Sequence, residues 1–106
     1  MTRDQILAGN EAVHRSINEA IERGQWPGEE PGTPFRCECA RRGCTAMLAL
    51  TRAQYESVRA DPRHFVVLPG HQQPDIEDVV EVASGYVVVE KRGESGRVAE
   101  ATDPRS

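Results

Sequence analysis

Apolar residues in the first part of the chain recur every three or four residues, the spacing of one face of an α-helix. We expect this helix to cover residues 3–23, because Thr2 and Gln5 form a capping-box pattern before it and Gly24 suits its C-terminal end. Its apolar stripe consists of Ile6, Leu7, Val13, Ile17, Ala20 and Ile21, with Asn10 on the same side. The stripe either packs on the rest of the protein or pairs with a second copy in a homodimer, which the seven-residue spacing of Ile6, Val13 and Ala20 permits.

The middle of the chain predicts a linker, a small hairpin and a short helix. Residues 25–34 contain three prolines and two glycines, a composition typical of a linker. Residues 35–37 and 45–50 are β-type runs that would form the two arms of a hairpin. Thr51 and Gln54 form a second capping box, which predicts a helix from Arg52 to Ala60 that ends before Asp61-Pro62.

The last part of the chain is rich in valine. Residues 65–68 predict a strand, and residues 79–82 and 86–89 predict a β-hairpin that turns at Gly85, although Ile76, Val79 and Val80 would also line a helix. Residues 92–106 are polar, lack periodicity and are expected to be disordered. The chain therefore predicts an α+β fold with an N-terminal helix (1–24), a linker (25–34), a zinc-binding α+β domain (35–91) with a zinc-knuckle hairpin, short helix and small antiparallel sheet, and a disordered tail (92–106).

Composition and charge narrow the class of protein. The 106 residues suit one small domain, and its core is modest because only 38% of the residues are hydrophobic. The formal net charge of -4 comes from residues 72–106, which carry eight acidic and four basic side chains. This balance is unlike the basic footprint of a nucleic-acid-binding protein. No apolar run has the length of a membrane span, so we expect a cytoplasmic protein that does not enter the membrane.

Three cysteines within eight residues, Cys37, Cys39 and Cys44, are the main chemical signal in the sequence. In an extended strand Cys37 and Cys39 project to the same side, and the four residues between Cys39 and Cys44 can turn the chain so that Cys44 faces them. Gly43 suits the left-handed conformation that such a turn needs. Clustered thiolates select soft metals, and Zn²⁺ is the expected ion because an iron centre would usually require a fourth cysteine.

The fourth ligand is expected to be His71. It follows Pro69 and Gly70, which form a turn that can hold an imidazole in a fixed position. His64 precedes a predicted strand and His14 lies in the predicted helix, where each is better explained as a surface or partly buried histidine than as a ligand. The expected metal ligands are therefore Cys37, Cys39, Cys44 and His71.

A disulfide is the competing explanation of the cysteines. It would leave one thiol over, and a bridge between Cys37 and Cys39 would be strained. No secretory signal peptide is recognisable, and disulfides are rare in the reducing cytosol. The metal site is the better interpretation.

Four motifs occur in a fixed order between residues 35 and 91: Phe35-x-Cys37-Glu38-Cys39-x4-Cys44, Leu50-Thr51-x3-Tyr55-Glu56-x-Val58-Arg59, Phe65-x-Val67-x-Pro69-Gly70-His71 and Tyr86-x-Val88-Val89-Glu90-Lys91. In this respect the chain resembles a group of small uncharacterised bacterial proteins of actinobacterial type. The resemblance implies that Cys37, Cys39, Cys44 and His71 belong together, and it brings no established activity. It does not include the N-terminal helix or the tail.

Three functional classes are compatible with this site. A structural Cys3His zinc site in an interaction or regulatory module with a protein partner is favoured, because a closed shell leaves no position for a substrate. The alternative is a redox- or metal-responsive sensor, in which oxidation of the thiolates releases zinc. A zinc-dependent hydrolase with Glu38 or His71 as general base is least favoured, since three thiolates weaken the Lewis acidity of zinc and Glu38 is expected at the surface. Four arginines could bind an acidic partner or RNA but are better explained as solvated surface: Arg36, Arg41, Arg42 and Arg63.

Overall fold

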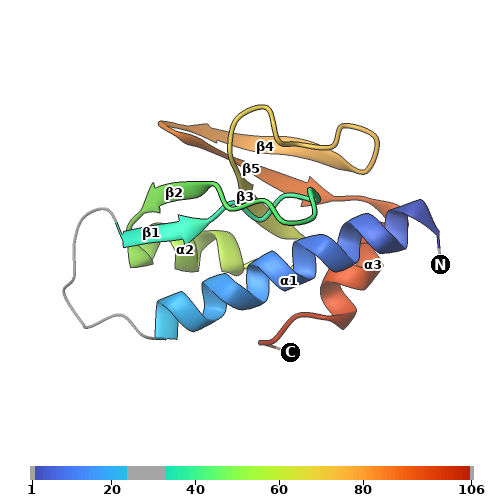
Figure 1. Ribbon diagram of the computed structural model, residues 1–106, viewed down its shortest axis with the longest axis horizontal. Coiled ribbons are helices and arrows are strands. Elements are labelled where there is room, and N and C mark those ends of the chain that lie inside the picture. Colours follow the sequence, from blue (N-terminus) through green and yellow to red (C-terminus); the bar gives the residue numbers. More distant parts are fainter. Residues whose placement is uncertain (1, 24–32, 106) are drawn as a thin grey trace.

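The computed structural model describes residues 2–23 and 33–105, and in them three helices combine with two small antiparallel sheets (Figure 1). The first sheet pairs two strands and the second has three, in the order β3-β5-β4. This is the α+β class that the sequence predicts. The elements are α1 (Arg3–Arg23), β1 (Thr33–Arg36), β2 (Met47–Leu50), α2 (Arg52–Arg59), β3 (His64–Val67), β4 (Glu77–Ala83), β5 (Tyr86–Lys91) and α3 (Gly93–Ala101).

The local signals in the sequence place several of these elements correctly. The hydroxyl of Thr51 accepts a hydrogen bond from the Gln54 amide at 3.1 Å, and the Gln54 side chain accepts one from the Thr51 amide at 2.8 Å, so the capping box of α2 is confirmed. The valine-rich segment forms the predicted hairpin, in which β4 pairs with β5 and Gly85 has a positive φ of 88° at the turn. Most of the linker predicted over residues 25–34 lies outside the described residues, and its last two residues begin β1.

The core lies where the two sheets meet α2. Phe35 of β1 stacks on Tyr55 of α2 with ring centroids 4.5 Å apart. From the larger sheet, Phe65 and Val89, which face each other in the β3–β5 register, are almost fully buried. Cys37 and Cys39 belong to the same buried cluster, so the predicted metal ligands are part of the core.

Part of the apolar stripe of α1 faces away from this core, although Ile21 packs against it. Ile6 is 49% exposed and Val13 is 60% exposed. Except for Ala8, the buried residues of the helix are charged or polar: Glu11, His14, Arg15, Asn18, Glu19 and Glu22. These side chains bind backbone groups and opposite charges on the rest of the protein, and a buried backbone polar group without such a partner would be costly.

The expectation of a disordered tail over residues 92–106 is wrong. Residues 93–101 form α3, which packs against α1 (Figure 1). The hydroxyl of Ser95 donates to the Arg92 carbonyl at 2.7 Å, and a side chain at Gly96 would collide with the guanidinium of Arg63. Polar contacts with distant residues also hold this helix: Gln5 donates to Glu94, and Arg63 donates to Glu100. Such contacts leave no apolar periodicity in the sequence, so the helix was not predicted.

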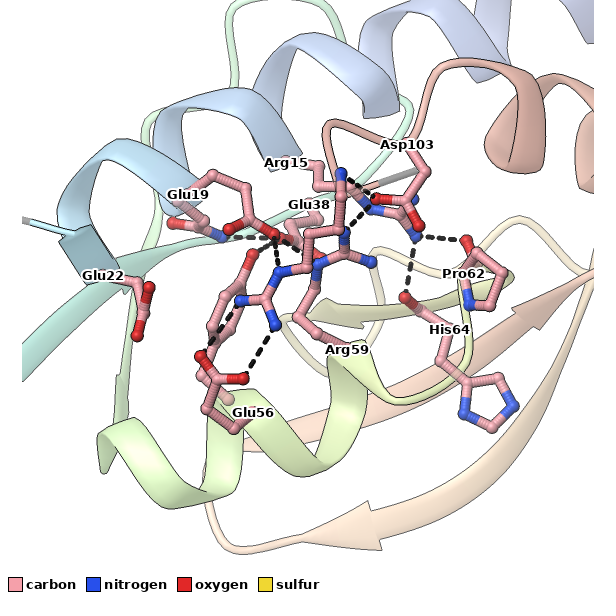
Figure 2. A network of polar contacts seen from close by, with 12 residues as sticks. Arg15, Glu19, Glu22, Glu38, Glu56, Arg59, Pro62, His64 and Asp103 are labelled. Carbon is pink, nitrogen blue, oxygen red and sulfur yellow. Dashed lines mark hydrogen bonds and ion pairs between the residues drawn. The ribbon is translucent and has the colours of Figure 1, made fainter.

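Buried ion pairs connect α1 and α2 to the segment after α3 (Figure 2). The guanidinium of Arg59, whose side chain is fully buried, binds the carboxylates of Glu19 and Asp103. Arg105 donates to Glu19 at 2.8 Å and also binds Glu56. Because one guanidinium serves both α1 and the C-terminal segment, the network holds these parts of the chain together.

A second buried cluster joins α1 to the larger sheet. Lys91 of β5 is ion-paired with Glu11 of α1 and with Glu77 of β4. Burial raises the pKa of Glu77 to about 7. One positive and two potentially negative groups share this space, so a proton on Glu77 lowers the cost of burying the cluster.

No helix among the described residues is both long enough and apolar enough to cross a membrane.

Removing the charge of Glu19 is expected to weaken the protein and change its response to acid. Burial raises the pKa of this carboxyl group, but hydrogen bonds from Arg105 and Arg59 lower it below the ordinary value of 4.5. Such a group stabilises the folded state above its unfolded pKa, and the contribution is lost as the pH falls through the folded pKa. Glu19→Gln should therefore lower the free energy of unfolding at pH 7, by about 1–3 kcal/mol, and the loss should shrink below about pH 4.5.

Urea unfolding at a series of pH values measures this difference. Glu81→Gln, which removes an exposed carboxylate on β4, is the matched control. If the loss of unfolding free energy caused by Glu19→Gln stayed constant between neutral and acid pH, it would contradict the assigned ion pairs.

Candidate metal centre

Two segments of the chain supply the predicted ligands. Cys37 and Cys39 lie in the extended segment after β1, and the turn that brings back Cys44 contains Gly43 with a φ of 76°. His71 lies in the turn after β3, where Gly70 has a φ of 94°. One ligand atom from each of Cys37, Cys39, Cys44 and His71 lies within 4.8 Å of the others. The fold therefore brings together the four residues that the sequence singled out.

The spacing of the ligand atoms suits a tetrahedral metal ion. The Nδ1 atom of His71 lies 3.6 Å from the Cys37 Sγ and 3.7 Å from the Cys44 Sγ. With metal–sulfur and metal–nitrogen bonds of about 2.3 and 2.05 Å at the tetrahedral angle, nitrogen and sulfur are separated by about 3.6 Å. Three sulfur atoms and one imidazole nitrogen therefore lie close enough together to hold a metal ion.

Contacts around the ligands hold the two segments against each other. The backbone amide of Leu68 donates to the Cys37 Sγ at 3.1 Å, and the His71 amide donates to the Leu68 carbonyl at 2.9 Å. Arg41 donates to the Gly70 carbonyl at 3.2 Å, and Arg36 donates to the Cys44 carbonyl at 3.2 Å. Two of the arginines that the sequence offered as a basic patch therefore support the ligand loops instead.

Protonation in this cluster is shared between neighbouring thiols. A hydrogen bond from Cys39 lowers the pKa of Cys37, and the same bond raises the pKa of Cys39, the group that keeps the proton. Burial and the nearby charge of Arg41 lower the pKa of His71. A neutral imidazole beside thiols that lose protons to a metal is the state that a Cys3His centre requires.

Helix α1 binds the backbone of the metal-ligand segment through a row of polar side chains one helical turn apart. Asn10 donates to the Ala40 carbonyl at 3.0 Å, and His14 hydrogen-bonds the Cys39 carbonyl at 2.8 Å. One turn further, Asn18 donates to the Arg36 carbonyl at 2.7 Å and accepts from the Arg36 amide. The i, i+4, i+8 spacing of the three residues follows the extended chain from Ala40 back to Arg36.

Glu38, expected at the surface, is fully buried. Because alternate residues of an extended chain face opposite ways, it points away from the sulfur atoms, toward α1 and α2. Its carboxylate accepts hydrogen bonds from Asn18 at 2.9 Å, Tyr55 at 3.1 Å and the Val66 amide at 3.1 Å. Burial raises its pKa, and the charge of Arg15 opposes that effect. Glu38 thus connects the metal-ligand segment to α1, α2 and β3.

The other histidines lie outside the ligand cluster. His14 is buried and bound to the Cys39 carbonyl, so it supports a ligand without being one. His64 Nε2 lies 3.1 Å from a carboxylate oxygen of Glu90 and 3.5 Å from one of Asp61, in a separate, partly exposed group of potential ligands. No sequence pattern indicates this role of His14, because its partner is a backbone carbonyl.

Two cavities of the described structure lie away from the metal ligands. The larger opens between α2 and the β4–β5 hairpin, with Ser57, Val80 and Tyr86 among its lining residues. The other is a groove beside α1 that includes Val13 and Ile17. A third, smaller cavity borders the ligand turn at Arg42 and Gly43, and none of the three is lined by a ligand residue.

Comparisons of the chain with protein-family models, with curated proteins and with solved structures found no match.

Asn18 is expected to be the most important of the three side chains that α1 places on the ligand segment. It is fully buried, and Asn18→Ala would leave the Arg36 backbone groups unpaired and Glu38 without one donor. We expect a loss of about 2–4 kcal/mol in the free energy of unfolding.

Asn10→Ala is the matched control, since Asn10 is half-buried and makes one such hydrogen bond. It should cost about 0.5–1.5 kcal/mol. Chemical denaturation of both variants measures the difference, and equal losses would argue against the role assigned to Asn18.

Proposed function

We propose that Cys37, Cys39, Cys44 and His71 bind one zinc ion whose role is structural, within a small interaction or regulatory module. The observation that carries this proposal is the convergence of three sulfur atoms and one imidazole nitrogen at distances suited to tetrahedral zinc. A complete set of four protein ligands is typical of structural zinc sites, whereas catalytic sites keep a position for water or substrate.

The surroundings of the site support a structural role over a hydrolytic one. Glu38, the nearest candidate for a general base, is engaged by Asn18, Tyr55 and the Val66 amide on the side away from the sulfur atoms. His71 directs its Nδ1 at Cys37 and Cys44, the position of a ligand. Both residues that a hydrolase would need for proton transfer therefore have other roles in this arrangement.

A surface on the larger sheet supports the interaction part of the proposal. β4 is an edge strand, and it exposes Val79, Val80 and Val82, the last at 78%. An exposed apolar edge strand can pair with an extended segment of a protein partner. The candidate metal centre joins the segment after β1 to the turn after β3 of this sheet, and a bound ion would hold the fold that presents this edge.

Metal analysis of purified variants tests the ligand set. The protein should contain one zinc per chain, Cys39→Ala should lose it, and His71→Ala should bind it at least about tenfold more weakly. His64→Ala, which removes a histidine outside the cluster, is the control and should keep full zinc content.

Full zinc affinity in His71→Ala would contradict the Cys3His assignment. It would indicate a fourth ligand that exchanges with solvent and would favour a catalytic centre.

The second candidate function, a redox-responsive zinc site, is favoured by the exposure of one edge of the cluster. Cys37 and Cys39 are buried, but Cys44 and His71 are only partly covered. Peroxide can reach the Cys44 thiolate there; two thiolates give it two electrons, forming one disulfide and two hydroxide ions, and zinc is released. The ligand segment would then lose its connection to the His71 turn.

Treatment with a small molar excess of hydrogen peroxide tests this candidate. A sensor should release zinc, detected with a chromogenic chelator, together with a change in circular dichroism that thiol reductant reverses. If peroxide changed neither the zinc content nor the circular dichroism spectrum, the sensor would be ruled out and only the structural role would remain.

A further inference from the structure

The outward face of α1 carries no charge over most of its length. Every charged side chain of the helix within residues 5–22 is buried against the rest of the protein: Glu11, Arg15, Glu19 and Glu22. The exposed face instead presents Ile6, Val13, Ser16 and Ala20 to solvent, with Gly9 and Ile17 partly covered beside them. A surface helix normally has the opposite arrangement, with its apolar side buried and its charges in water. Figure 1 shows α1 along one side of the molecule.

We infer that this face is the interface of a homodimer in which two α1 helices pack antiparallel about a two-fold axis at Val13. The seven-residue series runs from a large to a small side chain: Ile6, Val13, Ala20. About an axis at Val13, Ile6 lies opposite the partner's Ala20, and Gly9 lies opposite the partner's Ile17. On either side of the central pair of Val13 residues, each large residue then meets a small one. A parallel pair would instead place Ala20 against the partner's Ala20 and leave a gap, so the sequence complements itself in the antiparallel direction only.

Gly9 is a separate observation in favour of a close partner. It lies in the middle of a 21-residue helix, where glycine is less favourable than alanine. A Cβ atom built at Gly9 meets no atom within 4 Å in the protein itself. The chain's own packing therefore does not require glycine there, whereas the partner's Ile17 would use the space.

The surroundings of Val13 also suit this arrangement. A shallow groove beside it is lined by Ala12, Ile17 and Thr102, and it can receive the partner's Val13. The arginines at the two ends, Arg3 and Arg23, approach each other across the axis. Asp75 already pairs with Arg3, which reduces their repulsion.

The size of the contact sets the expected affinity. A helix of 21 residues is about 30 Å long, and a contact one helix wide buries less than the roughly 1,200 Å² of a standard interface. The dimer should therefore dissociate in the micromolar range and exchange readily.

Sedimentation equilibrium of the zinc-loaded full chain tests the interface. The protein should be dimeric at high micromolar concentration, and Val13→Glu should weaken the dimer at least about 100-fold without lowering the melting temperature of the monomer. Val82→Glu, which places the same charge on a more exposed valine of β4, should leave the dimer unchanged. A wild-type chain that stays monomeric, or a dimer that survives Val13→Glu, would overturn the proposal.

Gly9→Ala separates the two roles that a helix glycine can have. It should raise the melting temperature of the monomer, because alanine favours the helix, and weaken the dimer about tenfold, because the methyl group meets the partner's Ile17. A more stable helix with unchanged dimer affinity would overturn the proposed register.

Cross-linking tests the direction of the helices. Oxidation of Ile6→Cys alone should give no cross-linked dimer, whereas a mixture of Ile6→Cys and Ala20→Cys chains should give the mixed dimer. Efficient self-cross-linking of Ile6→Cys would show parallel helices and would refute the antiparallel model.

Discussion

The structure depends on the hydrogen bonds that the extended backbone of residues 36–40 makes with α1 on one side and with β3 on the other. This segment carries two of the candidate metal ligands, and its residues 37–40 are buried, so their amides and carbonyls need partners inside the protein. Helix α1 supplies one set through Asn10, His14 and Asn18, and β3 supplies the other through the bond from the Glu38 amide to the Val66 carbonyl. The polar side of α1 faces inward for this reason. Ile6 and Val13, on the opposite side of the helix, are consequently exposed.

Metal binding and packing share the same residues in this protein. Cys37 and Cys39 point to the ligand cluster, while Glu38 between them points to Asn18, Tyr55 and the Val66 amide. The alternation of an extended chain thus divides three consecutive residues between two networks. An ion in the cluster would hold the ligand segment to the His71 turn and, through the same backbone, to α1 and α2. Loss of that ion would weaken contacts well beyond its ligands.

Much of the local structure could be predicted from the sequence, and most errors concern buried polar residues. The capping box at Thr51, the turn at Gly85 and the approach of His71 to the cysteines depend on short patterns with a direct physical cause. The orientation of α1 could not be read from its apolar stripe, because Glu11, Arg15 and Glu19 are buried only in the presence of Lys91, distant carbonyls and Arg59. For the same reason, the burial of Glu38 and the formation of α3 were not predicted. Hydrophobic periodicity predicts the buried face of a helix correctly only when that face is apolar.

X-ray absorption at the zinc edge, on the protein loaded with one equivalent of zinc, tests the central claim most directly. The proposed centre predicts a shell of three sulfur atoms at about 2.3 Å and one nitrogen at about 2.0–2.1 Å, with the multiple-scattering signal of a single imidazole. In His71→Ala the imidazole signal should disappear while the three sulfur atoms remain. A first shell with fewer sulfur atoms, or an imidazole signal that persists in His71→Ala, would contradict a metal centre formed by Cys37, Cys39, Cys44 and His71.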